Sequence, residues 1–238
     1  SKNYIGKLVK LVKRVLRFAE SRGEQVHPAF KTRAFKVLTE EVSSVYLTES
    51  EIERVRRLEL APGSSLGITR DLFVVGCYTG LRYSDFSKLS QDHIREYQGV
   101  RMFEVRSQKT DERVSIPIHP VVEEIMASRN GRLPSFQNDQ LMNRNLKRIG
   151  LMAELDGMEE VERTEGGLRQ SRFKPKYELL QTHTARRSFC TNAYIKGLDT
   201  LDIMAISGHK TESNFLRYIK VTREQRAKRI AQHPFFAS

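Results

Sequence analysis

Hydrophobic residues recur every three or four positions along most of the chain, which is the spacing of amphipathic helices. Within 4–19, an apolar stripe is interleaved with basic side chains. Further helices are expected over 48–59, 66–78, 120–128, 138–153, 183–196, 199–206, 212–218 and 222–232, with a short one from Ser84. Three stretches, 93–97, 101–106 and 112–117, alternate apolar and polar residues instead. The pattern predicts a mostly α-helical protein with a small antiparallel β-sheet.

The periodicity also divides the chain. Residues 26–47 contain few periodic positions, so we expect a linker there. Thr48 and Glu51 have the spacing of a capping box, in which each residue binds the backbone N–H of the other at a helix start. The sequence therefore predicts a helical segment over 1–25, the linker, and a larger domain over 48–238 that ends in a C-terminal tail.

Composition and charge narrow the function classes. The 238 residues are 39% hydrophobic and 29% charged, as in soluble globular proteins, and the longest apolar run, 72–78, is too short to span a membrane. The net charge is +12, and residues 1–33 hold five Lys and four Arg against two Glu. The basic charge of the helix expected over 4–19 fits a nucleic acid partner, a membrane surface or merely a solvated basic face. The two cysteines, Cys77 and Cys190, suit a reducing cytosol.

Common enzyme patterns are missing from the sequence. It has no glycine-rich phosphate loop, no HExxH, no paired-cysteine zinc spacing and no two histidines four residues apart. Carboxylates cluster only in 154–165, which holds six acids and one Arg and is followed by the basic stretch 169–176. We interpret this pair as a hairpin or mobile loop with a solvated acidic face, and we expect no metal site.

Basic side chains and one tyrosine form a candidate constellation. Arg82 lies just past a helix stop, Lys109 lies in a predicted turn, and His183 and Arg186 share one helix face at i, i+3. His209 follows Gly208, and Tyr218 comes nine residues later. Taken singly, each has an ordinary explanation, because a lone Arg or a Lys in a turn is usually a surface residue. A Tyr at helical spacing is usually in the core. Taken together, the order and spacing of these residues along the chain change this interpretation.

The pattern TGLRYSD…HTARRSF…ISGHK…Y resembles the tyrosine recombinase (phage integrase) family over about 48–222. The HTARRSF and GH boxes are similar to integrases of mobile elements. The resemblance implies a tyrosine recombinase catalytic domain (α+β) and identifies residues 1–25 as the C-terminal remnant of a helical core-binding domain. Because the chain does not begin with Met, we expect it to be a fragment. Two departures are the long 154–176 segment and His209, where some members have Trp.

The resemblance implies a site-specific recombinase or integrase that cleaves and rejoins DNA through a 3′-phosphotyrosine, without metal, ATP or any cofactor. The implied roles are phosphate binding by Arg82, Arg186 and His209, general base or orienting action by His183, protonation of the 5′ oxygen by Lys109, nucleophilic attack by Tyr218 and clamping of Arg82 by Asp85. Forked, permanently charged arginines suit an anionic phosphodiester, and a Tyr hydroxyl with a pKa of about 10 needs a base or a cationic pocket.

The implied partner is double-stranded DNA, bound as a homo-tetramer by a protein that is monomeric when free and is not associated with membranes. It would be cytoplasmic, and nucleoid-associated in a bacterium. Candidate DNA-binding residues on the basic helix are Lys7, Lys10, Lys13, Arg14 and Arg17. Two alternatives stay open: a type IB topoisomerase-like nicking–closing enzyme and a catalytically vestigial basic DNA-binding module. The six intact site residues favour an active enzyme over the second of these.

Overall fold

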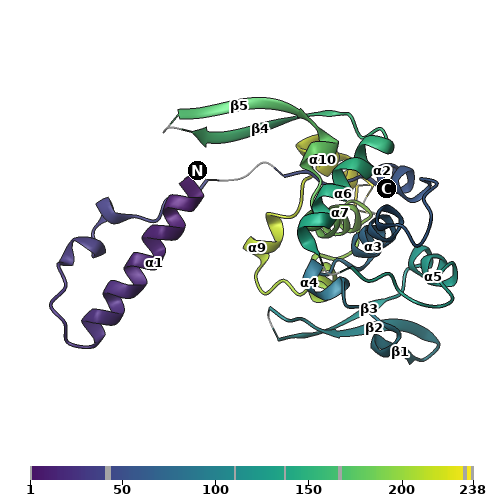
Figure 1. The fold of residues 1–238 in the computed structure, drawn as a ribbon, viewed down its shortest axis with the longest axis horizontal. Helices are drawn as coiled ribbons and strands as arrows, with labels where there is room; N and C mark the ends of the chain where they lie inside the picture. Colours follow the sequence, from purple (N-terminus) through teal and green to yellow (C-terminus); the bar gives the residue numbers. More distant parts are fainter. Residues whose placement is uncertain are drawn as a thin grey trace. The chain divides into compact units, whose positions relative to one another are not determined.

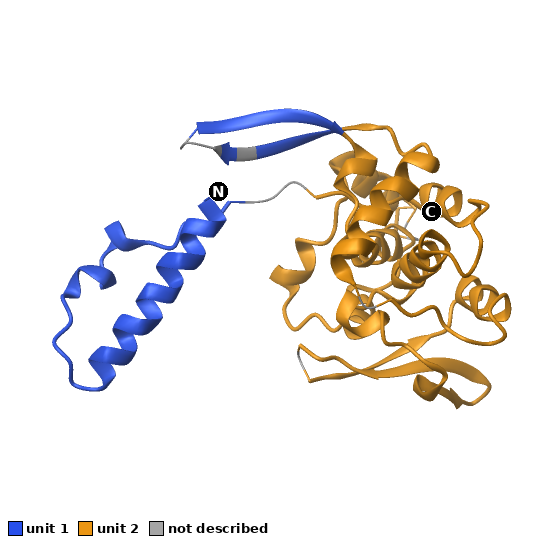
Figure 2. Cartoon of the chain, viewed as in Figure 1, with its two compact units in different colours: residues 1–43, 159–174 blue, residues 44–158, 175–238 orange. Residues whose placement is uncertain are grey.

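The computed structural model describes residues 2–40, 44–109, 111–136, 138–165, 168–232 and 235–236 (Figure 1). The chain forms two compact units, coloured separately in Figure 2. Unit 1 comprises Ser1–Ser43 and Glu159–Lys174, and unit 2 comprises Ser44–Met158 and Pro175–Ser238. In the described ranges, no helix is both long enough and apolar enough to cross a membrane.

Unit 1 begins with α1, Lys2–Ser21, which confirms the helix predicted over 4–19. Two short 3₁₀ helices follow, η1 (Pro28–Lys31) and η2 (Arg33–Phe35), inside the segment predicted as a linker. Phe30 in η1 is buried, so this segment packs as part of the unit rather than extending freely.

The chain then runs back along α1 in an extended conformation. Gly6 permits a close approach, because a Cβ there would lie 1.9 Å from the carbonyl oxygen of Leu38. The Asn3 side chain binds the Glu40 backbone twice, donating to its carbonyl at 2.9 Å and accepting from its N–H at 3.0 Å. One face of α1 carries several exposed hydrophobic residues, including Phe18.

Unit 2 contains the remaining helices. They are α2 (Glu49–Arg56), α3 (Ser65–Thr79), α4 (Tyr83–Phe86), α5 (Pro120–Ala127), α6 (Asp139–Met152), α7 (Thr182–Ile195), α8 (Thr200–Ser207), α9 (Glu212–Leu216) and α10 (Arg223–Ala231), with 3₁₀ turns η3 (Gln91–His93) and η4 (Lys176–Leu179). Every helix predicted from periodicity is present. The capping box is confirmed, since the Thr48 hydroxyl accepts from the Glu51 N–H and the Glu51 carboxylate accepts from the Thr48 N–H at 2.7 Å.

The predicted sheet consists of β1 (Ile94–Tyr97), β2 (Val100–Arg106) and β3 (Arg113–Pro117), antiparallel in the order β1-β2-β3. Phe103 pairs with Ile116 and Val105 with Val114, and all four are buried. The acidic and basic stretches form a second, two-stranded sheet of β4 (Met158–Glu165) and β5 (Leu168–Pro175), so the hairpin interpretation is the correct one of the two offered. The protein is mostly α-helical with small antiparallel sheets, as predicted.

Two hydrophobic cores share α7. The main core packs α3 against α7, α6 and α2 and reaches the β2–β3 strands. A smaller core, formed by Cys190, Tyr194, Ile203 and Phe215, holds α8, α9 and the following segment on the same helix. At the end of α3, Gly80 adopts φ +66°, and a Cβ there would lie 2.3 Å from the Phe189 ring. This glycine therefore turns the chain directly against α7, where the next residues enter the candidate site.

Candidate active site

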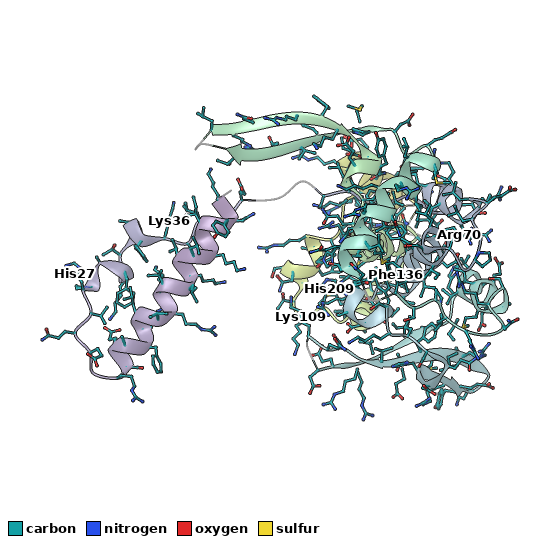
Figure 3. The ribbon with its side chains drawn as sticks, in the orientation of Figure 1. His27, Lys36, Arg70, Lys109, Phe136 and His209 are labelled. Atoms are coloured by element: carbon teal, nitrogen blue, oxygen red, sulfur yellow. The ribbon has the colours of Figure 1, made fainter. Side chains whose placement is uncertain are left out.

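All six predicted site residues lie in unit 2, on segments that converge on the N-terminal half of α7. Arg82 caps α4, Lys109 lies in the β2–β3 turn, and His209 follows α8. His183 and Arg186 are on α7, and Tyr218 follows α9. In Figure 3, Lys109 and His209 are labelled on the same side of the unit.

Arg186 is the largest fully buried side chain of the described residues, with 1% of its surface exposed. Its Nη1 donates to the carbonyl of Gly80 at 2.8 Å and to the carbonyl of Ser207. Its Nη2 lies beside the His209 ring, and its buried Nε has no hydrogen-bond partner. The guanidinium thus ties the end of α3 to the end of α8 and keeps an unused donor for a ligand.

The Tyr218 hydroxyl lies 2.6 Å from Nε2 of His183, close enough for proton transfer between them. Its ring packs edge-on against His209, with ring centroids 4.6 Å apart, and the Arg186 guanidinium carbon lies 5.4 Å from its centre. The nucleophile candidate and its candidate base are therefore in direct contact.

Thr191 anchors the backbone that carries Tyr218, a role that sequence analysis missed. Its fully buried hydroxyl donates to the Tyr218 carbonyl at 3.0 Å and accepts from the Lys220 N–H at 3.2 Å. Thr191 lies two helical turns after His183, so its position on the same stripe of α7 was the available signal. The hydroxyl fixes Tyr218 to the helix that supplies His183.

Both site imidazoles have strongly lowered pKa values. Burial, followed by the positive charges of Arg187, Arg186, Arg82 and Lys109, lowers the pKa of His183 to about 4. Burial, followed by Arg186, Arg82 and His183, lowers the pKa of His209 to about 3. Both rings are neutral at pH 7, so His183 can accept a proton.

Asp85 reaches Arg82 through Ser107 rather than directly. The buried Asp85 carboxylate accepts from the Ser107 hydroxyl at 3.4 Å and from the Gln108 N–H at 3.2 Å. Arg82 Nη1 in turn donates to the Ser107 oxygen at 3.2 Å. Ser107, which sequence analysis missed, therefore stands between the two. Asp85 fixes the start of the turn that carries Lys109 as well as Arg82.

The candidate DNA-binding residues lie in unit 1. Lys7, Lys10, Lys13, Arg14 and Arg17 line a groove of about 680 Å³ together with Leu8, Leu11 and Val37. No group of three or more His, Cys, Asp or Glu side chains in the described part of the chain is arranged to hold a metal ion.

The lowered imidazole pKa values predict a pH-dependent stability. In the unfolded chain a His has a pKa of about 6.5. The unfolded state therefore binds more protons than the folded state between about pH 6.5 and pH 4, and the free energy of unfolding falls as the pH falls. One pKa unit corresponds to about 1.4 kcal/mol. Allowing for partial exposure, we expect His183 and His209 together to account for a loss of about 3 kcal/mol.

Urea denaturation at pH 7 and pH 4.5 measures the loss in the free energy of unfolding. Other titratable groups also contribute to this loss. The comparison with His209→Asn isolates the imidazole contribution, because the variant retains a polar side chain but does not titrate. The variant should lose less stability than the wild type between the two pH values. An equal loss in both proteins would contradict the burial of a neutral His209.

Comparison with known proteins shows what this arrangement resembles. No protein-family model matches the chain, and a search of curated proteins found no significant match. Solved structures do match. They include the Tn1549 transposon integrase with circular intermediate DNA (17% identity, TM-score 0.61, 97% of this chain and 79% of that one) and a lambda integrase tetramer bound to a Holliday junction (17%, 0.62, 89% and 58%).

A third match is XerH recombinase bound to a palindromic difH substrate, with 17% identity and a TM-score of 0.54 over 79% of this chain. The chain spans about half, 52%, of the length of that XerH chain. At these identities the similarity concerns the fold. The chain has the tyrosine recombinase fold, which the Tn1549 transposon integrase, a mobile-element integrase, also has.

Proposed function

We propose that this chain, which has the tyrosine recombinase fold, cleaves and rejoins DNA strands at specific sites through a 3′-phosphotyrosine on Tyr218. The observation that carries the proposal is the 2.6 Å contact between the Tyr218 hydroxyl and His183 Nε2, next to a buried arginine. A nucleophile in contact with a neutral base is the arrangement that activates a weak hydroxyl.

In the proposed cleavage step, a bond from Tyr218 to phosphorus replaces the bond from phosphorus to the 5′ oxygen. The Tyr218 oxygen attacks the phosphorus while its proton passes to Nε2 of His183. The bond between phosphorus and the 5′ oxygen breaks, and that oxygen leaves with a proton from Lys109. A 5′-hydroxyl from the same or another strand then attacks the phosphotyrosine, reverses the proton transfers and frees Tyr218. The free energy of the phosphodiester is conserved, so neither ATP nor a metal is needed.

Arg82 and Arg186 would stabilise the charge that gathers on the phosphate oxygens. Arg186 has a buried Nε without a partner, and Arg82 has one Nη engaged with Ser107. Both cations are held in place before the reaction, so little reorganisation is required. Asp85 and Ser107 would act by positioning Arg82 and the Lys109 turn.

The proposed partner is double-stranded DNA, with a homo-tetramer assembling on it from free monomers. The net charge of +12 and the basic groove of α1 support DNA binding, and the matching lambda integrase structure is a tetramer on a Holliday junction. We further propose that the catalytic domain covers residues 48–238 and that residues 1–25 are the end of a core-binding domain.

Covalent trapping on a nicked suicide substrate tests the proposal. The wild type should form an SDS-resistant adduct with one DNA strand, and the adduct should persist in EDTA without ATP. Two further substrates separate the alternatives. Resolution of a two-site junction would support recombination, whereas relaxation of supercoiled plasmid without junction resolution would support a nicking–closing enzyme. DNA binding without any adduct would support a vestigial binding module.

Lys109→Ala should slow cleavage of ordinary DNA by about 10²–10⁴-fold, because the leaving 5′ oxygen loses its proton donor. The loss should be less than about tenfold on a substrate with a 5′-bridging sulfur, because a thiolate leaves without a proton. Single-turnover cleavage rates on both substrates measure the difference. Arg106→Gln is the matched control, since Arg106 is an exposed cation on the same hairpin, paired with Asp111. Equal losses on both substrates for Lys109→Ala would assign Lys109 to charge stabilisation.

DNA binding should be weak and should depend steeply on salt. The log–log slope of affinity against salt is about −0.9 for each phosphate neutralised. Neutralising Lys10 and Arg14 together should remove two phosphate contacts, which makes the slope shallower by about 1.8. Arg57→Gln should change the slope less, because Arg57 is already paired with Glu53. Nanomolar binding that is insensitive to salt would contradict phosphate contacts by α1.

A further inference from the structure

The side chain of Ser207 is buried directly beside the candidate site. Only 2% of Ser207 is exposed, and it is the last residue of α8, immediately before Gly208 and His209. Gly208 has φ +64°, a left-handed conformation that turns His209 back over the helix end. As a result the Ser207 oxygen faces two polar atoms at once, the Ile203 carbonyl and Nδ1 of His209.

The hydroxyl has one proton, and the geometry shows where it points. The Ser207 oxygen lies 2.5 Å from the Ile203 carbonyl oxygen. A carbonyl can only accept, and two oxygens this close repel unless a proton lies between them, so Ser207 donates to Ile203. The Ser207 oxygen therefore meets Nδ1 of His209, 2.7 Å away, as an acceptor. Nδ1 must carry the hydrogen.

The other side of the ring is consistent with this assignment. Nη2 of Arg186 lies 3.0 Å from Nε2 and 3.2 Å from Nδ1 of His209. A guanidinium only donates, so the ring has to offer it a lone pair. Arg186 alone does not choose between the two nitrogens. Because Ser207 engages the Nδ1 hydrogen, the available lone pair is the one on Nε2.

We propose that Ser207 is a positioning residue that holds His209 in the Nδ1–H tautomer, so that His209 can donate to a bound phosphate from Nε2 only after taking up a second proton. The proposal rests on the proposed function for its second half, the role toward the phosphate. Its first half, the tautomer, concerns the free protein alone. Donation by His209 to the phosphate is thereby coupled to proton uptake.

The charged groups around His209 explain why uptake awaits DNA. Arg186 and His183 face it from α7, Arg82 from the start of α4, and Tyr218 from the segment after α9. The adjacent Lys210 is paired with Glu112 at 3.1 Å. The arginine charges oppose protonation in the free protein. A scissile phosphate placed among the same groups offsets them and favours the charged imidazole.

Nitrogen-15 NMR of the free, full chain tests the tautomer, with the His209 signals assigned by their loss in His209→Asn. At pH 7 the wild type should show Nδ1 protonated and Nε2 unprotonated. Ser207→Ala removes only the acceptor and should shift the ring toward the Nε2–H form, whereas Ser207→Thr keeps the hydroxyl and should retain Nδ1–H. A wild-type ring with Nε2–H, or an unchanged tautomer in Ser207→Ala, would overturn the proposal. The wild-type spectrum decides even if the Ala variant does not fold.

Calorimetry tests the proton uptake. Tyr218→Phe is expected to bind DNA without cleaving it. On binding DNA at pH 7 it should take up as much as one proton per site, seen as a dependence of the binding enthalpy on the buffer. Adding His209→Asn or Ser207→Ala to this variant should remove or reduce the uptake. Binding without uptake in Tyr218→Phe would overturn the coupling. If the tautomers are as expected and no protein forms an adduct, the recombinase function fails while the Ser207 assignment stands.

Discussion

Tyr218→Phe is expected to abolish the covalent protein–DNA adduct, a loss of at least about 10⁴-fold in cleavage rate, since removal of a nucleophile eliminates the reaction path. The change removes one oxygen and its 2.6 Å contact with His183 while leaving the ring packed against His209. The free energy of unfolding should therefore change by about 1 kcal/mol or less. DNA binding should survive, because Arg82, Arg186 and Lys109 remain.

The matched control is Tyr97→Phe, which removes the hydroxyl of an exposed tyrosine on β1 and should leave adduct formation unchanged. Adduct yield on a nicked suicide substrate, resolved in SDS, measures both variants. An SDS-resistant adduct in Tyr218→Phe would reject the proposed nucleophile. Loss of the wild-type adduct on addition of EDTA would reject the metal-independent mechanism.

Arg186→Gln is expected to impair both activity and stability. The variant removes preorganised charge at the phosphate, for which losses of about 10²–10³-fold in rate are typical. It also leaves the carbonyls of Gly80 and Ser207 without their shared donor in a buried site. At about 1–3 kcal/mol for each unsatisfied buried group, we expect a destabilisation of about 3 kcal/mol.

A second variant separates the two effects. Asp71 is a buried carboxylate on α3 that binds Arg129 through Nε at 2.8 Å and Nη2 at 2.6 Å, away from the candidate site. Asp71 also accepts from Arg70 Nε at 2.8 Å, so Asp71→Asn removes the negative charge that both arginines pair with and should cost about 3–5 kcal/mol. Single-turnover cleavage, measured where both variants are folded by circular dichroism, should be normal for Asp71→Asn and slow for Arg186→Gln. Equal rates would show that Arg186 is only structural.

Local sequence patterns were enough to locate the helices and strands of unit 2, because local interactions specify them. The Thr48–Glu51 capping box starts α2, and Gly80 ends α3 in the left-handed conformation that glycine tolerates. Alternation in β2 and β3 placed Phe103 and Ile116 on the same buried face. The order and spacing of the six site residues, through the family resemblance, also singled out side chains that the fold gathers around one end of α7.

Sequence patterns were weaker where packing outweighs propensity. The segment over 26–47 lacks helical periodicity, yet Phe30 is buried and the chain passes close to Gly6. Local sequence patterns do not predict the approach to Gly6, because it depends on which residue of the returning chain lies beside α1. The acidic and basic stretches likewise fitted a hairpin or a loop until strand pairing selected the hairpin.

The way the site residues are held depends on contacts that only folding creates. Ser107 joins Arg82 to Asp85, although it lies 22 residues from Asp85 in sequence, and Thr191 holds the backbone of Tyr218 across 27 residues. Ser207 is close to His209 in sequence, but the direction of its hydrogen bond depends on the Ile203 carbonyl. The positions of Ser and Thr hydroxyls follow no sequence period. Whether such a hydroxyl donates or accepts is set only when folding brings its hydrogen-bond partners close. The sequence singled out the candidate groups for the proposed chemistry, and tertiary packing determined their orientation.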